Sequence, residues 1–183
     1  MTEAARVVVF AVGNPSRGDD ALGPRLLERI VDAYPGLATV SDFQLQVEHA
    51  LDLKDADLAL FIDAAVNLDG PYRLFELEAR GTVPVFSHAL SPQAVLAVHR
   101  SVEGSASPPS FMLAVRGQDF ELGSPLSAVA SDALESAWIL IRELLSAPAP
   151  ERWRRSASAN PAGAQPESIA CQALSAAGNR IAR

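Results

Sequence analysis

Short apolar runs alternate along this chain with segments in which apolar residues recur every three or four positions. The run Val7–Val12 is apolar and mostly β-branched, as in a strand that is buried on both faces of a parallel sheet. Four further runs of strand length are expected at residues 38–45, 57–62, 71–77 and 110–115. Helical spacing predicts helices at residues 20–34, after Ser91, and at 126–147. Strands that alternate with helices predict an α/β fold with a single doubly wound, mostly parallel sheet and helices on both faces.

The composition changes at Pro148. Proline, alanine and serine dominate the chain from there on, and few large apolar side chains remain. We therefore expect one α/β domain over residues 1–147 and a flexible tail over residues 148–183. The single cysteine, Cys171, falls in this tail and excludes an internal disulfide framework.

Charge and hydropathy exclude several classes of partner. The formal net charge is −7 over 183 residues, and Lys54 is the only lysine, so no basic surface is expected to bind nucleic acid. The first residues carry Glu3 and Arg6 before a run of only strand length, which fits neither a signal peptide nor a membrane span. We expect a cytoplasmic protein with no membrane partner.

Three side chains are expected to meet at the carboxyl edge of the sheet, where open α/β folds bind ligands. Asp20 follows the turn after the first strand, Asp63 follows the strand at residues 57–62, and His88 precedes the helix that starts after Ser91. Two carboxylates and an imidazole suit a divalent metal, and they equally suit general acid and base catalysis. The chain has no G-x-S-x-G elbow, no H-E-x-x-H motif and no P-loop.

Each of these residues also has a purely structural interpretation. Asp20 or Asp63 could cap a helix or turn, and His88 could be a surface histidine. Asp19 fits a role as a cap or a loop support better than a role in chemistry. Arg17 could anchor its loop or contact a substrate. The two other histidines, His49 and His99, are expected to be structural or exposed.

Three motifs, taken together, resemble the hydrogenase maturation protease family. They are GNPSRGDDALGP after the first strand, LFIDA at a later strand, and SHALSP before a helix. The resemblance covers residues 7–145, which is nearly the whole predicted domain. It implies an aspartyl-type endopeptidase that removes the C-terminal extension of the [NiFe] hydrogenase large-subunit precursor.

The resemblance also implies roles for single residues. Asp20, Asp63 and His88 would be metal ligands, and the metal would be the nickel carried by the precursor. Other divalent metals are expected to occupy such a site in vitro. Asp20 and Asp63 would also be catalytic, while Asp19, Asn14 and Arg17 would support them.

The chain departs from the family pattern in three places, one of which is Ala21, where the family often has glycine. Some members have their histidine a few positions later, where this chain has Gln93. The sequence DFQLQVEHALDL replaces a glycine-rich turn after the second strand and suggests the subgroup that serves soluble, NAD-linked hydrogenases. Two alternatives remain open: a maturation factor that binds nickel and precursor without cutting, and a small-molecule hydrolase that uses Asp20 and Asp63.

Overall fold

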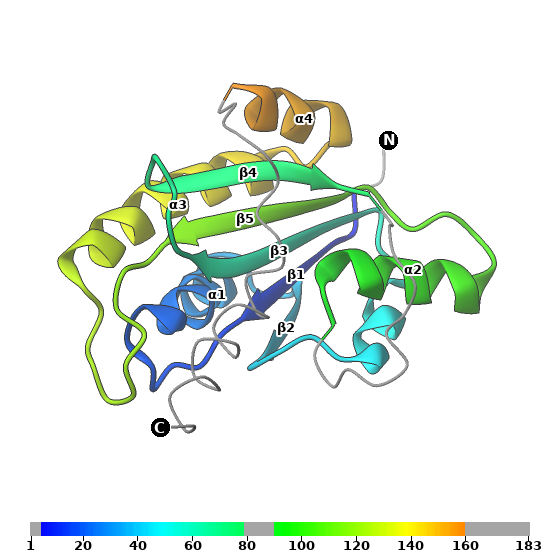
Figure 1. Cartoon of the computed structure of the whole chain (residues 1–183). Helices are drawn as coiled ribbons and strands as arrows, with labels where there is room; N and C mark the ends of the chain where they lie inside the picture. The colour runs from blue at the N-terminus through cyan, green and yellow to red at the C-terminus, as the bar shows by residue number, and fades with distance from the viewer. Residues whose placement is uncertain (1–4, 79–89, 160–183) are drawn as a thin grey trace.

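The computed structural model describes residues 5–78 and 90–159, and its core is a five-stranded sheet in the order β2-β1-β3-β5-β4 (Figure 1). The strands are β1 (Val7–Val12), β2 (Ala38–Asp42), β3 (Leu58–Ala65), β4 (Tyr72–Leu77) and β5 (Ser110–Arg116). The helical elements are η1 (Gly18–Ala21), α1 (Leu22–Ala33), η2 (Val47–Leu53), α2 (Pro92–Glu103), α3 (Ala128–Ser146) and α4 (Pro150–Ser158). Four strands are parallel, and β4 pairs antiparallel with β5 at one edge. The predicted α/β fold and the edge position of β4 are therefore confirmed.

Helices cover both faces of the sheet, because each buried strand contributes side chains to two apolar layers. On one face, Val9 and Leu60 pack with residues of α1 and α3. On the other face, Phe10 and Phe61 stack with their ring centroids 4.6 Å apart, in a cluster that includes residues of η2 and α2. Figure 1 shows α1 and α3 on one side of the strands and α2 on the other.

Most predicted elements occur, with altered bounds. The helix expected at residues 20–34 begins as the separate turn η1 and becomes α-helical only at Leu22. Helix α2 starts at Pro92, and the hydroxyl of Ser91 accepts a hydrogen bond from the Ala94 N–H, as expected of an N-cap. Asp63 lies within β3, whereas the sequence had placed it just after the strand.

The predicted domain boundary at residue 147 is wrong for the described part of the tail. Residues 150–158 form helix α4, and Trp153 is completely buried beside Phe111 of β5, with its indole N–H donating to the Leu144 carbonyl at 3.0 Å. Arg154 also makes a bidentate ion pair with Glu76 of β4. One large aromatic side chain is enough to attach a segment whose composition resembles a linker. The folded domain therefore extends at least to Ala159, and residues 160–183, including Cys171, lie outside the described residues.

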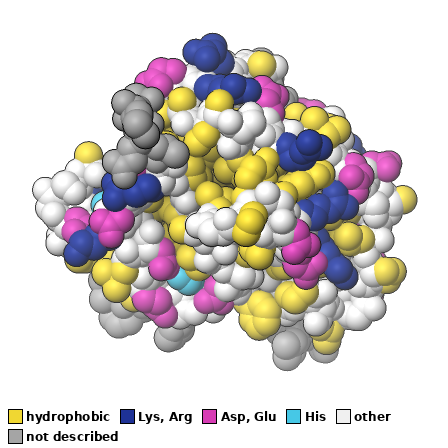
Figure 2. Space-filling model, turned by 180° about the vertical axis from the view of Figure 1, so that it is seen from behind, with side chains coloured by type: hydrophobic (Ala, Val, Ile, Leu, Met, Phe, Trp, Pro, Cys, Tyr) yellow, Lys and Arg dark blue, Asp and Glu magenta, His cyan; other side chains and the backbone are white. Residues whose placement is uncertain are grey.

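Eight large apolar side chains are exposed in the described part of the chain. Figure 2 shows the back of the molecule, where hydrophobic side chains line a hollow near the middle and charged side chains lie around it. Within the described residues, every helix is too short or too polar to cross a membrane.

Candidate active site

The turn between β1 and η1 forms the floor of the candidate site because two glycines allow the backbone to pack tightly. Gly13 has φ +141°, and an added Cβ there would overlap the Asp20 carbonyl oxygen. A Cβ at Gly23 would overlap the Val12 carbonyl oxygen, so only glycine lets the first turn of α1 approach the end of β1 this closely. The two glycines hold Asp20 at the carboxyl end of β1, as the sequence predicts.

Asp20 is half-buried and is held by the turn itself. Its Oδ2 accepts a hydrogen bond from the Asn14 N–H at 2.9 Å, and the Asn14 Oδ1 accepts from the Ser16 N–H at 2.9 Å. Burial raises the pKa of Asp20, and this effect outweighs the lowering by the Asn14 hydrogen bond and by the positive charge of Arg17. Asn14 is thus a direct partner of the carboxylate.

Asp63 is 7% exposed and belongs to the central strand β3. Its Oδ1 accepts a hydrogen bond from the Ala64 N–H at 2.8 Å. In β3 the side chains alternate between the two faces, so Asp63 follows Ala59 and Phe61 onto the face covered by η2 and α2. Its neighbour across the ladder in β5 is Ala114, which has a small side chain.

Asp20 is close enough to Asp63 for its negative charge to act on the Asp63 carboxyl group. Burial raises the pKa of Asp63 well above its usual range, and the negative charge of Asp20 raises it further, against a smaller lowering by the Ala64 hydrogen bond. Two carboxylates in such a position favour sharing a proton or a cation over carrying two uncompensated negative charges. The pair therefore suits either proton transfer or the binding of a metal ion.

Asp19 differs from its neighbour because its side chain is completely buried and fully hydrogen-bonded. Its Oδ2 accepts from the N–H groups of Gln118 at 2.6 Å and Asp119 at 2.9 Å, and from the Ser127 hydroxyl at 2.7 Å. Its Oδ1 accepts from the Ser127 N–H at 2.7 Å. Burial acts to raise the pKa of Asp19, but these hydrogen bonds outweigh it, so the pKa is lowered. Asp19 thus fastens η1 to the connection between β5 and α3.

The same connection is held at a second point by Arg17. The Arg17 guanidinium donates through Nε to the Phe120 carbonyl at 3.3 Å, and the Gly123 N–H donates to the Ser16 carbonyl at 2.8 Å. Arg17 therefore anchors its loop, which was one of its two interpretations, while its positive charge also acts on Asp20. In Figure 1 this connection is the long loop between β5 and α3.

The third predicted ligand, His88, lies outside the described residues, so its relation to Asp20 and Asp63 stays a prediction. Across residues 5–78 and 90–159, no three His, Cys, Asp or Glu side chains are grouped so that they could hold a metal ion. The donor types of Asp20 and Asp63 still fit a divalent metal, since carboxylate oxygens are suitable ligands and the mutual repulsion of the pair favours a cation. Gln93 is half-buried in the first turn of α2.

The other two histidines are buried and structural. His49 accepts a hydrogen bond at Nδ1 from the Gln46 N–H at 2.9 Å, and its Nε2 lies 3.5 Å from a carboxylate oxygen of Asp42 at the end of β2. His99 of α2 shares a hydrogen bond of 3.2 Å with the Ser107 hydroxyl. The Asp42 carbonyl accepts from the Gly13 N–H at 3.1 Å, so the His49 cluster adjoins the site turn.

Sequence reasoning missed the residues that hold Asp19. Gln118 and Asp119 act through their backbone N–H groups, which leave no signal in the side-chain pattern. Ser127 did offer a signal, because a serine directly before a long helix is a typical N-cap. Its hydroxyl accepts from the Ala130 N–H at 3.1 Å and donates to Asp19, so one side chain caps α3 and also holds the site loop.

Comparison with known proteins identifies the fold. No family model matches the sequence, and no curated protein matches it. The described architecture is similar to the [NiFe] hydrogenase maturation protease HycI from Thermococcus kodakarensis KOD1, with TM-score 0.58 and 20% identity over 79% of this chain and 95% of that one. It is also similar to the hydrogenase maturating endopeptidase HybD from E. coli, with TM-score 0.58 and 22% identity over 77% and 92% of the two chains.

A third solved structure agrees with these two. The hydrogenase 2 maturation peptidase from Thaumarchaeota archaeon SCGC_AB-539-E09 matches with TM-score 0.56 and 24% identity, over 77% of this chain and 98% of that one. All three solved structures are covered almost completely by the match. This chain therefore has the fold of the [NiFe] hydrogenase maturation proteases, as its three sequence motifs had indicated.

Proposed function

We propose that this protein is an endopeptidase that removes the C-terminal extension of a [NiFe] hydrogenase large-subunit precursor. The observation that carries the proposal is the pair Asp20 and Asp63, in which the charge of Asp20 acts on the buried Asp63 carboxyl group, in a fold shared with maturation proteases. Asp19, Asn14 and Arg17 support the pair: Asn14 holds the Asp20 carboxylate, and the other two fix the surrounding loop.

The carboxylate pair suits the hydrolysis of a peptide bond. In the proposed reaction, one carboxylate takes a proton from a water molecule while the water oxygen adds to the scissile carbonyl carbon. The C–N bond then breaks, and the proton passes to the leaving amine nitrogen. A carboxyl group with a raised pKa is well matched to this exchange near neutral pH, which is the direction in which burial shifts both Asp20 and Asp63.

Nickel enters this proposal as part of the substrate. We propose that Asp20, Asp63 and His88 contact the nickel of the precursor, so that only a loaded precursor is cut. A bound divalent metal supplies Lewis acidity toward a carbonyl or a water molecule. The side chains of this chain orient the precursor and accept or release the proton.

The test uses cells that make the matching hydrogenase and follows conversion of the large subunit to its shorter form. Asp20→Asn and Asp63→Asn should each abolish conversion, whereas Asp32→Asn, an exposed acid of α1, should leave it unchanged. Thermal unfolding of each purified variant separates a lost activity from a lost fold. Normal conversion by both site variants would refute the assignment, and binding of precursor without any conversion by the unaltered protein would indicate a non-proteolytic factor.

The third ligand and the target have their own tests. His88→Ala should abolish conversion, whereas Gln93→Ala should not, and the reverse result would transfer the role to Gln93. We propose a soluble, NAD-linked hydrogenase as the target because the segment before and within η2 replaces the glycine-rich turn of the family. Purified precursors of several hydrogenase types, offered in parallel, test this choice: preferential cutting of another type would refute it.

A further inference from the structure

One edge strand of the sheet, β4, is covered by a helix, whereas the other edge strand, β2, is open in the described chain. Helix α4 packs beside the β4 edge, where Arg154 pairs with Glu76. At the other edge, β2 pairs with β1 alone, and in the described chain no strand pairs with its outer side. An open edge presents backbone N–H and C=O groups that can pair with an added strand. The β2 edge is therefore able to receive an extended segment of another protein.

Apolar side chains lie exposed beside this edge. Phe43 directly follows β2, and Val47 and Leu51 are on the solvent side of η2; all three are more than half exposed. The buried side of η2 carries Ala50 and Leu53, so the exposed pair is not needed for the core. Three of the eight exposed large apolar residues in the described chain therefore fall on the single connection between β2 and β3, where a partner on this edge could cover them.

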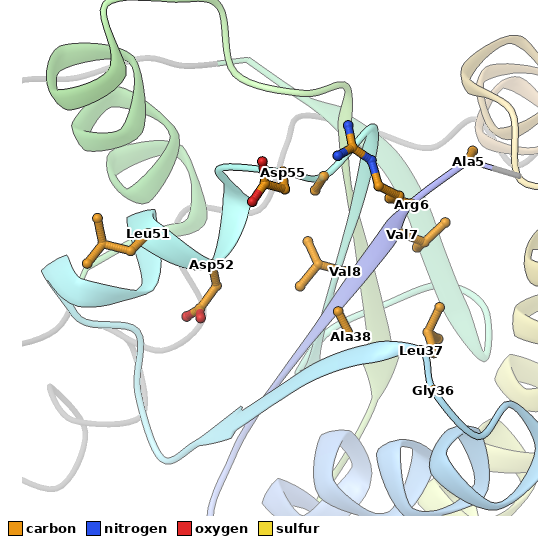
Figure 3. A pocket seen from close by; sticks show the side chains of 11 residues that line it. Ala5, Arg6, Val7, Val8, Gly36, Leu37, Ala38, Leu51, Asp52 and Asp55 are labelled. Carbon is orange, nitrogen blue, oxygen red and sulfur yellow. The ribbon is translucent and has the colours of Figure 1, made fainter. Parts of the chain in front are cut away.

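A pocket of about 410 Å³ lies at the amino end of the same edge (Figure 3). Figure 3 shows Leu37 and Ala38 on its β2 side and Leu51, Asp52 and Asp55 on its η2 side. Its lining is apolar apart from these two acids and Arg6, which binds Asp57 through two hydrogen bonds of 3.0 and 3.1 Å.

The charge of the pocket selects its occupant. Asp52 and Asp55 are exposed, and in the described part of the chain neither makes an ion pair within 4.0 Å. A pocket with apolar walls and two such carboxylates at its border favours a long side chain with a positive end, as in lysine or arginine.

The carboxyl end of β2 lies beside the turn that holds Asp20. The four residue steps of β2 from Ala38 at the pocket to Asp42 cover about 13 Å, at roughly 3.3 Å per residue. The Asp42 carbonyl accepts a hydrogen bond from Gly13, whose neighbour Asn14 holds the Asp20 carboxylate. A segment laid along the outer side of β2 would thus start at the pocket and end at the carboxyl edge of the sheet, about 10 Å, or two strand spacings, from the end of β1 that leads to Asp20.

We propose that the open edge of β2, with Leu51 and the acidic pocket beside it, binds an extended segment of the large-subunit precursor that carries a lysine or arginine. Backbone pairing along β2 would supply affinity, and the pocket would supply selectivity for the basic side chain. The proposal rests on the proposed function for the identity of the partner, but its surface is distinct from the residues that would perform the cleavage.

Binding is measured with the purified precursor of the matching hydrogenase, in an Asp20→Asn background that prevents cutting. Leu51→Ser and the double variant Asp52→Asn/Asp55→Asn should each weaken binding about tenfold. Val102→Ser and Asp132→Asn, exposed residues of α2 and α3, are matched controls that should leave binding unchanged. In the active background the same surface variants should raise KM without changing kcat.

Hydrogen exchange provides a readout of the edge itself. Precursor binding should slow exchange of the backbone amides of residues 38–42, and the double acid variant should reduce the salt dependence of binding. Unchanged exchange at 38–42, or unchanged affinity of both surface variants, would overturn the proposal. A self-associated protein that Leu51→Ser dissociates without altering precursor affinity would also overturn it, by assigning the surface to a second copy.

The outcomes separate this proposal from the proposed function. Binding that depends on Leu51 and the two acids, without cleavage by the unaltered protein, would refute the protease function and leave the docking surface standing. Cleavage with unaltered KM in the surface variants would refute the docking surface alone. Absence of any precursor binding would overturn both.

Discussion

The adjacent acids Asp19 and Asp20 should respond in opposite ways to the same substitution. Asp19→Asn retains the shape of the side chain, and its amide oxygen can occupy the position of Oδ2, which accepts three hydrogen bonds. The amide nitrogen then takes the place of Oδ1, which had accepted a hydrogen bond from the Ser127 N–H. Because two donors now face each other, a buried donor stays unsatisfied, at a cost of about 1–3 kcal/mol. Loss of charge assistance in the other three bonds brings the total to about 3–5 kcal/mol.

Asp20→Asn should not destabilise the fold. The Asn14 N–H retains an oxygen acceptor, while the buried charge and its repulsion of Asp63 disappear. We expect a free energy of unfolding that is equal to that of the unaltered protein or higher by about 1 kcal/mol. Urea and thermal unfolding at pH 7 measure both variants, and Asp19→Asn should lower Tm by about 6–20 °C.

The pH dependence gives the comparison a second check. Asp19 has a lowered pKa in the folded state, so its contribution to stability is present above the ordinary value of 3.8 and is lost as the pH falls through the lower folded pKa. The deficit of Asp19→Asn should therefore shrink in acid. Asp20 has a raised pKa, so any gain in Asp20→Asn should be present at pH 7 and disappear toward pH 4. An Asp19→Asn protein as stable as the unaltered one at pH 7 would refute the role given to these hydrogen bonds.

Three other predictions concern the packing and charge of the fold. Gly23→Ala should lower the free energy of unfolding by about 2–4 kcal/mol, since the new Cβ would overlap the backbone of β1, whereas Gly70→Ala should have little effect; equal urea midpoints would contradict this. Trp153→Ala should cost about 3–5 kcal/mol in chemical unfolding, and a near-neutral result would exclude α4 from the core. The pKa of Asp63 is raised in the folded state, so the free energy of unfolding should fall as the pH rises from 4 through that pKa. Asp63→Asn should flatten this fall. An unchanged slope would contradict the statement that burial opposes ionisation of Asp63.

The local pattern of the sequence is sufficient to predict the sheet and the place of Asp20. Buried parallel strands such as β1 have a continuous apolar signal, and the Ser91 and Pro92 pair marks a helix start by chemistry that needs no distant partner. Asp20 and Asp63 could be assigned to one edge of the sheet because parallel strands all end there.

The remaining features depend on contacts between distant residues. The segment around Trp153 has the composition of a linker, and only the contacts of its indole with Leu144 of α3 and Phe111 of β5 make it part of the domain. Three of the four groups that hydrogen-bond to the Asp19 side chain are backbone N–H groups 99 to 108 residues away, so the sequence cannot distinguish this buried support from the half-buried Asp20. His88 remains a prediction from sequence alone.

The hydrogen bonds of Asp19 have a consequence for the order of events during synthesis. They join positions that are 99, 100 and 108 residues apart, so they form only after β5 and the start of α3 have been made. Closing such a long loop is slow and costs chain entropy before any contact is gained. A nascent chain that ends before Gln118 therefore has the strand and the acidic turn but none of the groups that hydrogen-bond to the Asp19 side chain. We expect the site to become ordered late in synthesis, after all five strands of the sheet have been made.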